Sequence, residues 1–111
     1  MALFPKITAM SGLLQQAKQV QEQIEEIQKE LAQLRIVGRA GGGLVTATVN
    51  GQQELLSIKL DEDLHKEDLE MVEDLILAAV RQALRKSREQ SQEKLNSVTG
   101  GLLGGLNLPG M

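Results

Sequence analysis

Two short runs of alternating apolar and polar residues flank the dipeptide Asn50-Gly51, and this arrangement constrains the fold more than any other feature of the chain. The runs cover about residues 44–49 and about residues 54–60. A period of two is typical of a half-buried strand, and Asn-Gly between two such runs is a strong signal for a β-hairpin. The sequence therefore predicts an antiparallel hairpin whose strands have one apolar face and one mixed face.

A third strand is expected directly before this hairpin. The run at about residues 35–40 is short and contains β-branched residues, and three glycines at 41–43 provide a turn into the hairpin. We therefore predict a three-stranded antiparallel sheet. The residues expected on its apolar face in the hairpin are Val45, Ala47, Val49, Leu56, Ile58 and Leu60. A sheet this small needs a cover on its apolar face.

Before the sheet, apolar residues recur at alternating intervals of three and four, as in the heptads of a coiled coil. They are Met10, Leu13, Ala17, Val20, Ile24, Ile27, Leu31 and Leu34. We predict a helix over about residues 8–34, with Thr8 or Ser11 as its N-cap. The partner of this seam is either the second helix of the same chain or another subunit. An ordinary amphipathic helix that packs on its own sheet is the alternative.

A second helix is predicted after the sheet, at about residues 66–96. Its first half has a wide apolar stripe that can cover the sheet, and its acidic start suits the positive end of the helix dipole. The segment from Lys86 to Lys94 is almost entirely polar, so we expect it to project beyond the core or to meet only a partner. We predict a single domain over residues 1–98 and a Gly-rich disordered tail over 99–111.

The residue types argue against an enzyme. The chain has no Cys and a single His, His65, which has no nucleophile or acid–base pair beside it. The glycines at 41–43 connect two strands, whereas a nucleotide-binding glycine loop opens a helix, so we interpret them as a turn. The carboxylates from Asp61 to Asp74 lack the spacing of a calcium loop. We expect no cofactor, no metal site, no small-molecule substrate and no membrane segment.

Several cations are candidates for contact with nucleic acid. They are Arg81, Arg85, Arg88, Lys94, Arg35 and Arg39. The first three recur at i, i+4 and i+7 and so form one stripe on the second helix, from which they could contact phosphates without reading bases. The alternative is a solvated helix end whose cations suit the dipole. A formal charge of −3 argues mildly against a strongly basic binder, and one Phe with no Trp or Tyr argues against base stacking.

Short motifs over about residues 10–98 carry a resemblance to a known family. They are the Gln-containing segments 15–18 and 31–34, Val37-Gly38-x-x-Gly41-x-Gly43-Leu44-Val45, Val49-Asn50-Gly51, Ile58-x-Leu60-Asp61, the segment 70–75 and Glu93-Lys94. In this order and spacing, the chain resembles the YbaB/EbfC family of bacterial nucleoid-associated proteins.

The resemblance implies an α/β (α+β) homodimer with a helix–three-strand–helix order and helices that project like tweezer arms. It also implies a cytoplasmic protein that associates with the nucleoid, binds double-stranded DNA, and alters DNA conformation or influences gene expression. It supplies no catalytic residues and no DNA-contact motif, so the candidate cations rest on charge placement. The alternative function is a protein–protein adaptor that uses the exposed helical seam, which the acidic charge balance supports.

Overall fold

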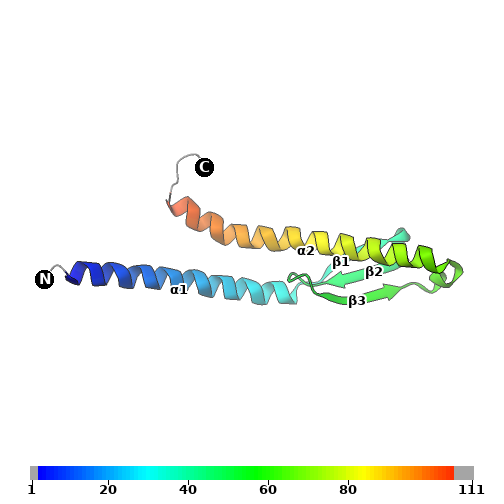
Figure 1. The fold of residues 1–111 in the computed structure, drawn as a ribbon, viewed down its shortest axis with the longest axis horizontal. Helices are drawn as coiled ribbons and strands as arrows, with labels where there is room; N and C mark the ends of the chain where they lie inside the picture. The colour runs from blue at the N-terminus through cyan, green and yellow to red at the C-terminus, as the bar shows by residue number, and fades with distance from the viewer. Residues whose placement is uncertain (1–2, 107–111) are drawn as a thin grey trace.

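In the computed structural model, which describes residues 3–106 and the side chains of residues 12–98, two long helices flank a small sheet (Figure 1). The elements are α1 (Leu3–Gln33), β1 (Ile36–Ala40), the 3₁₀ turn η1 (Gly41–Gly43), β2 (Val45–Val49), β3 (Leu55–Leu60), the 3₁₀ helix η2 (Glu62–Lys66) and α2 (Leu69–Leu106). This order confirms the predicted fold class. Neither described helix is long and apolar enough to cross a membrane.

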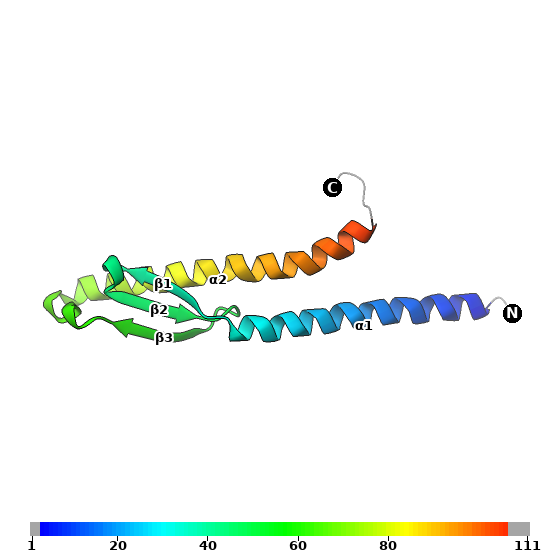
Figure 2. The ribbon, with the colours of Figure 1, turned by 180° about the vertical axis from the view of Figure 1, so that it is seen from behind.

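The molecule is elongated, with extents of 82 × 29 × 16 Å. α2 begins at the far tip of the sheet, crosses one face of it, and continues beside α1 (Figures 1 and 2). α1 leaves the sheet at the opposite end from that tip. The free ends of both helices therefore point in the same direction, away from the sheet.

The sheet is antiparallel with the strand order β1-β2-β3, as predicted. In the hairpin, Val45 lies opposite Leu60 and Ala47 lies opposite Ile58. These two pairs place their side chains on one face, which confirms that part of the predicted apolar face. The apolar face of β1 and β2 is the one that α2 covers.

The pairing of β2 and β3 departs from strict alternation at the loop end of the hairpin. The register of β2 and β3 shifts by one residue between Thr48 and Val49, and Val49 pairs with Leu55 instead of Leu56. An extra residue of this kind is a β-bulge, which interrupts the strict alternation from which the face was assigned. Residue parity therefore fails at the loop end of the hairpin.

The core lies between α2 and the first two strands. Its buried members are Ile36, Val45, Ala47, Val49, Leu64, Ala79 and Ala83. The closest approach is at Gly38, where an added Cβ atom would lie 2.2 Å from the carbonyl oxygen of Ala79 and 2.5 Å from the amide nitrogen of Ala83. The backbone of α2 thus packs directly on β1, which fixes the orientation of the helix.

β3 is not covered by α2, because the helix lies over β1 and β2. The prediction that the second helix covers the sheet therefore holds for two strands only. Four apolar residues of β3 stay 40–49% exposed: Leu55, Leu56, Ile58 and Leu60. We refer to these four residues as the β3 patch.

The hairpin loop joins the sheet to both helices. The Gly51 amide donates a 2.7 Å hydrogen bond to the carbonyl oxygen of Leu31, and the Ser87 hydroxyl donates a 2.7 Å bond to the carbonyl oxygen of Asn50. A Cβ atom on Gly51 would meet the Leu31 backbone at 2.8 Å, so this glycine permits a close approach of two segments. The residue with positive φ in the loop is Gln53, at 64°. Asn50-Gly51 therefore marks the hairpin but does not form a two-residue turn.

α1 packs on the rest of the chain only near its end. Leu31 is buried and Ile27 is partly buried, whereas Leu13 is 65% exposed and Ile24 is 39% exposed. Met10, the first residue of the predicted seam, lies outside the described side chains. Over residues 12–26 the seam therefore has little cover from this chain.

Two helix ends differ most from the predictions. α1 already begins at Leu3, because Pro5 falls in its first turn, where a missing N–H costs no helical bond; Thr8 and Ser11 are therefore not N-caps. α2 extends through Leu106, where a disordered tail was predicted. Extending an existing helix needs no new nucleus, so its late glycines weaken it without ending it. Residues 107–111 lie outside the described residues.

The polar segment of α2 does not project freely over its whole length. Ser87 is fully buried against the hairpin loop, although residues 86–94 were predicted to lie beyond the core. Its hydroxyl is satisfied by a backbone carbonyl, which makes a polar side chain compatible with burial.

Candidate nucleic-acid interface

Arg81, Arg85 and Arg88 lie on the face of α2 that points away from the sheet. The buried residues Ala79, Ala83 and Ser87 face the sheet, and the three arginines are exposed on the opposite side of the helix. They span about 10 Å along the helix axis. Within residues 12–98, none of the three side chains has a hydrogen bond or ion pair to another residue. We call these three residues the arginine stripe.

The charge of the molecule is divided along its length. Residues 81–94 contain five cations and two carboxylates, whereas residues 61–74 contain eight carboxylates and one lysine. The acidic residues lie at the tip formed by η2 and the start of α2, and the stripe lies farther along α2. Asp74 and Arg81 are about 10 Å apart along the axis, which is close to one Debye length at physiological salt. The acidic tip therefore neutralises the stripe only weakly.

Two of the other predicted cations have local partners. The Arg35 guanidinium donates hydrogen bonds to the carbonyl oxygens of Ala32, at 3.3 Å, and Leu34, at 3.0 Å, at the end of α1. Lys94 forms a 3.1 Å ion pair with Glu30, which connects α2 to α1. These interactions direct both side chains toward α1, so the structure does not bring them together with the arginine stripe.

Arg39 lies on a different layer of the molecule. Its neighbour Gly38 faces α2, so Arg39 projects from the opposite face of the sheet. Its backbone N–H donates a 2.7 Å hydrogen bond to the side-chain oxygen of Gln82. Lys59 lies in the same cross-strand row, because both residues are opposite Thr46. Sequence reasoning missed Lys59, although correct strand pairing identifies it as a neighbour of Arg39.

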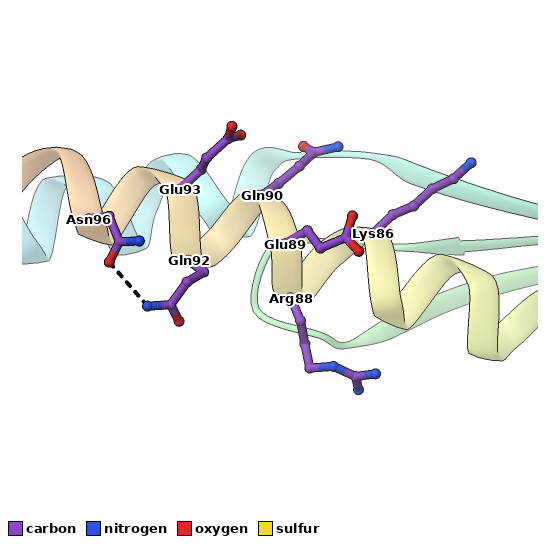
Figure 3. Close-up of a pocket in the computed structure, with 7 residues that line it drawn as sticks. All are labelled: Lys86, Arg88, Glu89, Gln90, Gln92, Glu93 and Asn96. Atoms are coloured by element: carbon purple, nitrogen blue, oxygen red, sulfur yellow. Dashed lines mark hydrogen bonds between the residues drawn. The ribbon is translucent and has the colours of Figure 1, made fainter.

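An open polar depression follows the stripe along α2 (Figure 3). Its lining residues are Lys86, Arg88, Glu89, Gln90, Gln92, Glu93 and Asn96. Lys86 and Arg88 point to different sides of the helix, and the Lys86 ammonium donates a 3.1 Å hydrogen bond to the carbonyl oxygen of Val37 (Figure 3). Because one helix supplies every lining residue, the depression is an open surface of α2 and does not enclose a small molecule.

The carboxylates of the acidic tip are spread along η2 and the start of α2. Among the residues that the structure describes, no group of three or more His, Cys, Asp or Glu side chains could hold an ion. Part of the acidic charge has a local structural role, since the Asp61 carboxylate accepts the N–H of Asp63 at 2.9 Å and caps η2.

Comparison with known sequences identifies the family to which the chain is similar. The chain matches the YbaB/EbfC DNA-binding family over residues 6–102. It is 43% identical over 109 residues to a nucleoid-associated protein of Thermoanaerobacter pseudethanolicus, covering 97% of this chain and 95% of the relative. It is 47% identical over 103 residues to a nucleoid-associated protein of Rhodococcus erythropolis, covering 91% of this chain and 92% of the relative.

A solved structure has a similar fold. The crystal structure of an uncharacterized protein from Helicobacter pylori superposes with a TM-score of 0.57 at 25% sequence identity. The match covers 73% of this chain and 92% of the other chain.

Proposed function

Because this chain belongs to the YbaB/EbfC DNA-binding family, we propose that it is a nucleoid-associated protein that binds duplex DNA as a homodimer, mainly through the phosphate backbone. The observation that carries this proposal is the arginine stripe, three exposed guanidinium groups with no partner among the described residues. The names of the Thermoanaerobacter and Rhodococcus relatives support a location at the nucleoid in the cytoplasm. Binding along the backbone would alter DNA conformation and so influence gene expression.

Arginine is well suited to this contact. Its guanidinium stays charged at every physiological pH and can donate two parallel hydrogen bonds to one phosphate. Duplex DNA carries one negative charge per about 1.7 Å of axis, so each arginine that touches a phosphate releases counterions and makes affinity depend on salt. Such contacts carry no sequence information directly, and therefore we expect broad sequence preference.

The homodimer is supported by the β3 patch. Its four apolar side chains, 40–49% exposed, belong to the edge strand β3, whose outer N–H and C=O groups have no partner in the described chain. Exposed apolar surface and an unpaired edge both favour association. A two-fold axis at the patch would cover both copies with one self-complementary contact. The dimer would then carry two arginine stripes.

The salt dependence of DNA affinity tests the proposal. Fluorescence anisotropy of a labelled duplex should be measured for the wild type and for the triple variant R81Q/R85Q/R88Q. Six contacts in the dimer predict a slope of log K against log salt of about −5, and the variant should lose most of it. The affinity should fall for every duplex sequence alike.

The matched control is K18Q/K29Q/K66Q, which removes the same charge from exposed lysines outside the stripe. It should retain most of the wild-type slope. Wild-type binding by the stripe variant would place the DNA contact elsewhere, with α1 as the next candidate. If wild-type protein free of nucleic acid failed to bind any duplex at low salt, an adaptor function through the α1 seam would replace this proposal.

A further inference from the structure

We propose that the face of the sheet opposite α2 is a second contact surface for the backbone of duplex DNA. We call this surface the outer face, and its residues are Val37, Arg39, Thr46, Thr48, Ser57 and Lys59. The inference rests on the proposed DNA binding and adds a site that shares no residue with the arginine stripe.

The strand register arranges these residues in two rows. Arg39 lies opposite Thr46, which lies opposite Lys59, so one row has a cation at each end and a hydroxyl in the middle. The neighbouring row has two further hydroxyls, on Thr48 and Ser57. Adjacent strands are about 4.8 Å apart, which places the backbones of the two cations about 10 Å apart. This span is close to the major-groove width of about 12 Å, so the two long side chains can reach phosphates on both strands.

The side chains of the two cations are available for binding. Arg39 and Lys59 are exposed, and within residues 12–98 neither side chain has a hydrogen bond or ion pair to another residue. The bond from Arg39 to Gln82 uses the backbone N–H, so the guanidinium keeps all its donors. Hydroxyls between the cations supply further donors for phosphate oxygens.

Charge complementarity identifies DNA as the occupant. A solvent-facing sheet surface is commonly polar, but such surfaces usually mix both signs of charge. The two rows of the outer face contain two cations and no carboxylate, in a chain with 15 acidic residues. Asp61 and Glu62 line the depression next to Lys59, where the Asp61 carboxylate accepts the N–H of Asp63. The contact should therefore extend from Lys59 toward Arg39, away from this acidic end.

The outer face and the arginine stripe lie on opposite sides of the two-layer domain. The stripe points outward from the α2 layer, whereas Arg39 and Lys59 point outward from the sheet layer. One straight duplex cannot touch both surfaces of the same subunit. The outer face is therefore best measured in the R81Q/R85Q/R88Q background, where the stripe no longer dominates binding.

The first experiment adds R39Q/K59Q to that background and follows duplex binding by anisotropy between 20 and about 100 mM salt. We expect the background to retain weak, salt-dependent binding. A duplex that lies on the outer face of one subunit loses two phosphate contacts, which should reduce the slope by about 1.8 and the affinity roughly sixtyfold at 0.1 M salt. The matched control K18Q/K66Q removes the same charge from exposed lysines elsewhere and should change the slope little.

A second variant, S57K, tests the same surface by a gain of binding, which misfolding cannot produce. Ser57 is exposed on the outer face, in the row next to the two cations. In the stripe-free background, one added contact should steepen the slope by about 0.9 and raise affinity roughly eightfold at 0.1 M salt.

The possible outcomes separate this inference from the proposed function. If the wild type binds DNA but the stripe-free background does not, or if R39Q/K59Q and S57K both leave its binding unchanged, the outer face is not a DNA surface. A change in dimer mass on R39Q/K59Q would show that the face lies between copies of the chain and would refute the inference. Failure of the wild type to bind any duplex would refute both proposals together.

Discussion

Replacing Gly38 with alanine should destabilise the protein strongly, because this residue is where β1 touches α2. The added Cβ atom would lie 2.2 Å from the carbonyl oxygen of Ala79 and 2.5 Å from the amide nitrogen of Ala83. Both neighbours are backbone atoms of a helix, so no side chain can turn away. The contact must open by about 1 Å, which moves the helix off the sheet and loosens a core that packs at crystal-like density.

The magnitude follows from the size of this displacement. Overpacking a well-packed site typically costs about 1–3 kcal/mol, occasionally more. Gly38→Ala belongs at the upper end, about 3 kcal/mol, since a whole helix must shift and the buried residues Ala79 and Ala83 lose contacts. For a domain of this size, that corresponds to a decrease in Tm of about 10–20 °C.

Urea unfolding followed by circular dichroism measures the effect, with the protomer concentration held constant because the proposed dimerisation would couple to stability. Gly12→Ala is the matched control. Gly12 lies within α1 with no atom within 4 Å of the added Cβ, so the same change should stabilise the helix by about 0.5–1 kcal/mol. Opposite signs for the two variants are expected. A Gly38→Ala protein within about 0.5 kcal/mol of wild type would refute the direct packing of α2 on β1.

Three other experiments test the junctions and the proposed dimer. Ser87→Ala removes one of two donors to the carbonyl of Asn50, which keeps the N–H of Gln53 at 3.2 Å, and should lower the free energy of unfolding by about 0.5–1.5 kcal/mol in urea titrations. A double-mutant cycle on Glu30→Ala and Lys94→Ala should give a coupling energy of only about 0.2–1 kcal/mol, because the pair is partly exposed; a larger value would contradict this reading. Ile58→Glu should produce a folded monomer by analytical ultracentrifugation, and an unchanged dimer mass would exclude the β3 patch.

The order of the elements could be predicted because each has a distinct local signal. The alternation on both sides of Asn50-Gly51 identifies the hairpin, and the periodic apolar residues identify both helices. The ends of the helices could not be predicted equally well. Pro5 and the glycines after residue 99 are local signals against a helix, but a long helix extends through unfavourable residues once it is nucleated.

The errors within the sheet have a different cause. The bulge lies at the loop end of the hairpin, where the loop also contacts α1 and α2, and no local pattern in the sequence predicts it. The dipeptide Asn50-Gly51 predicts a turn, whereas in the structure the absence of a side chain on Gly51 permits close packing against the backbone of Leu31. The exposure of β3 depends on where α2 crosses the sheet, and that position is fixed by the packing at Gly38.

In the candidate site, too, local patterns could be predicted and tertiary contacts could not. The arginine stripe could be predicted because i, i+4 and i+7 share a helix face in any α-helix. The local partners of Arg35 and Lys94 required the structure, since Glu30 lies 64 positions from Lys94 in the sequence. The row of Arg39, Thr46 and Lys59 could be identified only from the register of both strand pairs, which the structure provides.

We propose that this chain binds duplex DNA through cations that contact phosphates. The most direct test is to titrate the wild-type protein into two duplexes of unrelated sequence at several salt concentrations. We predict equal affinities for both duplexes and a common slope of log K against log salt of about −5, equivalent to a loss of roughly 10³-fold between 50 and 200 mM salt. Binding that is independent of salt, or the absence of binding at low salt, would contradict the claim.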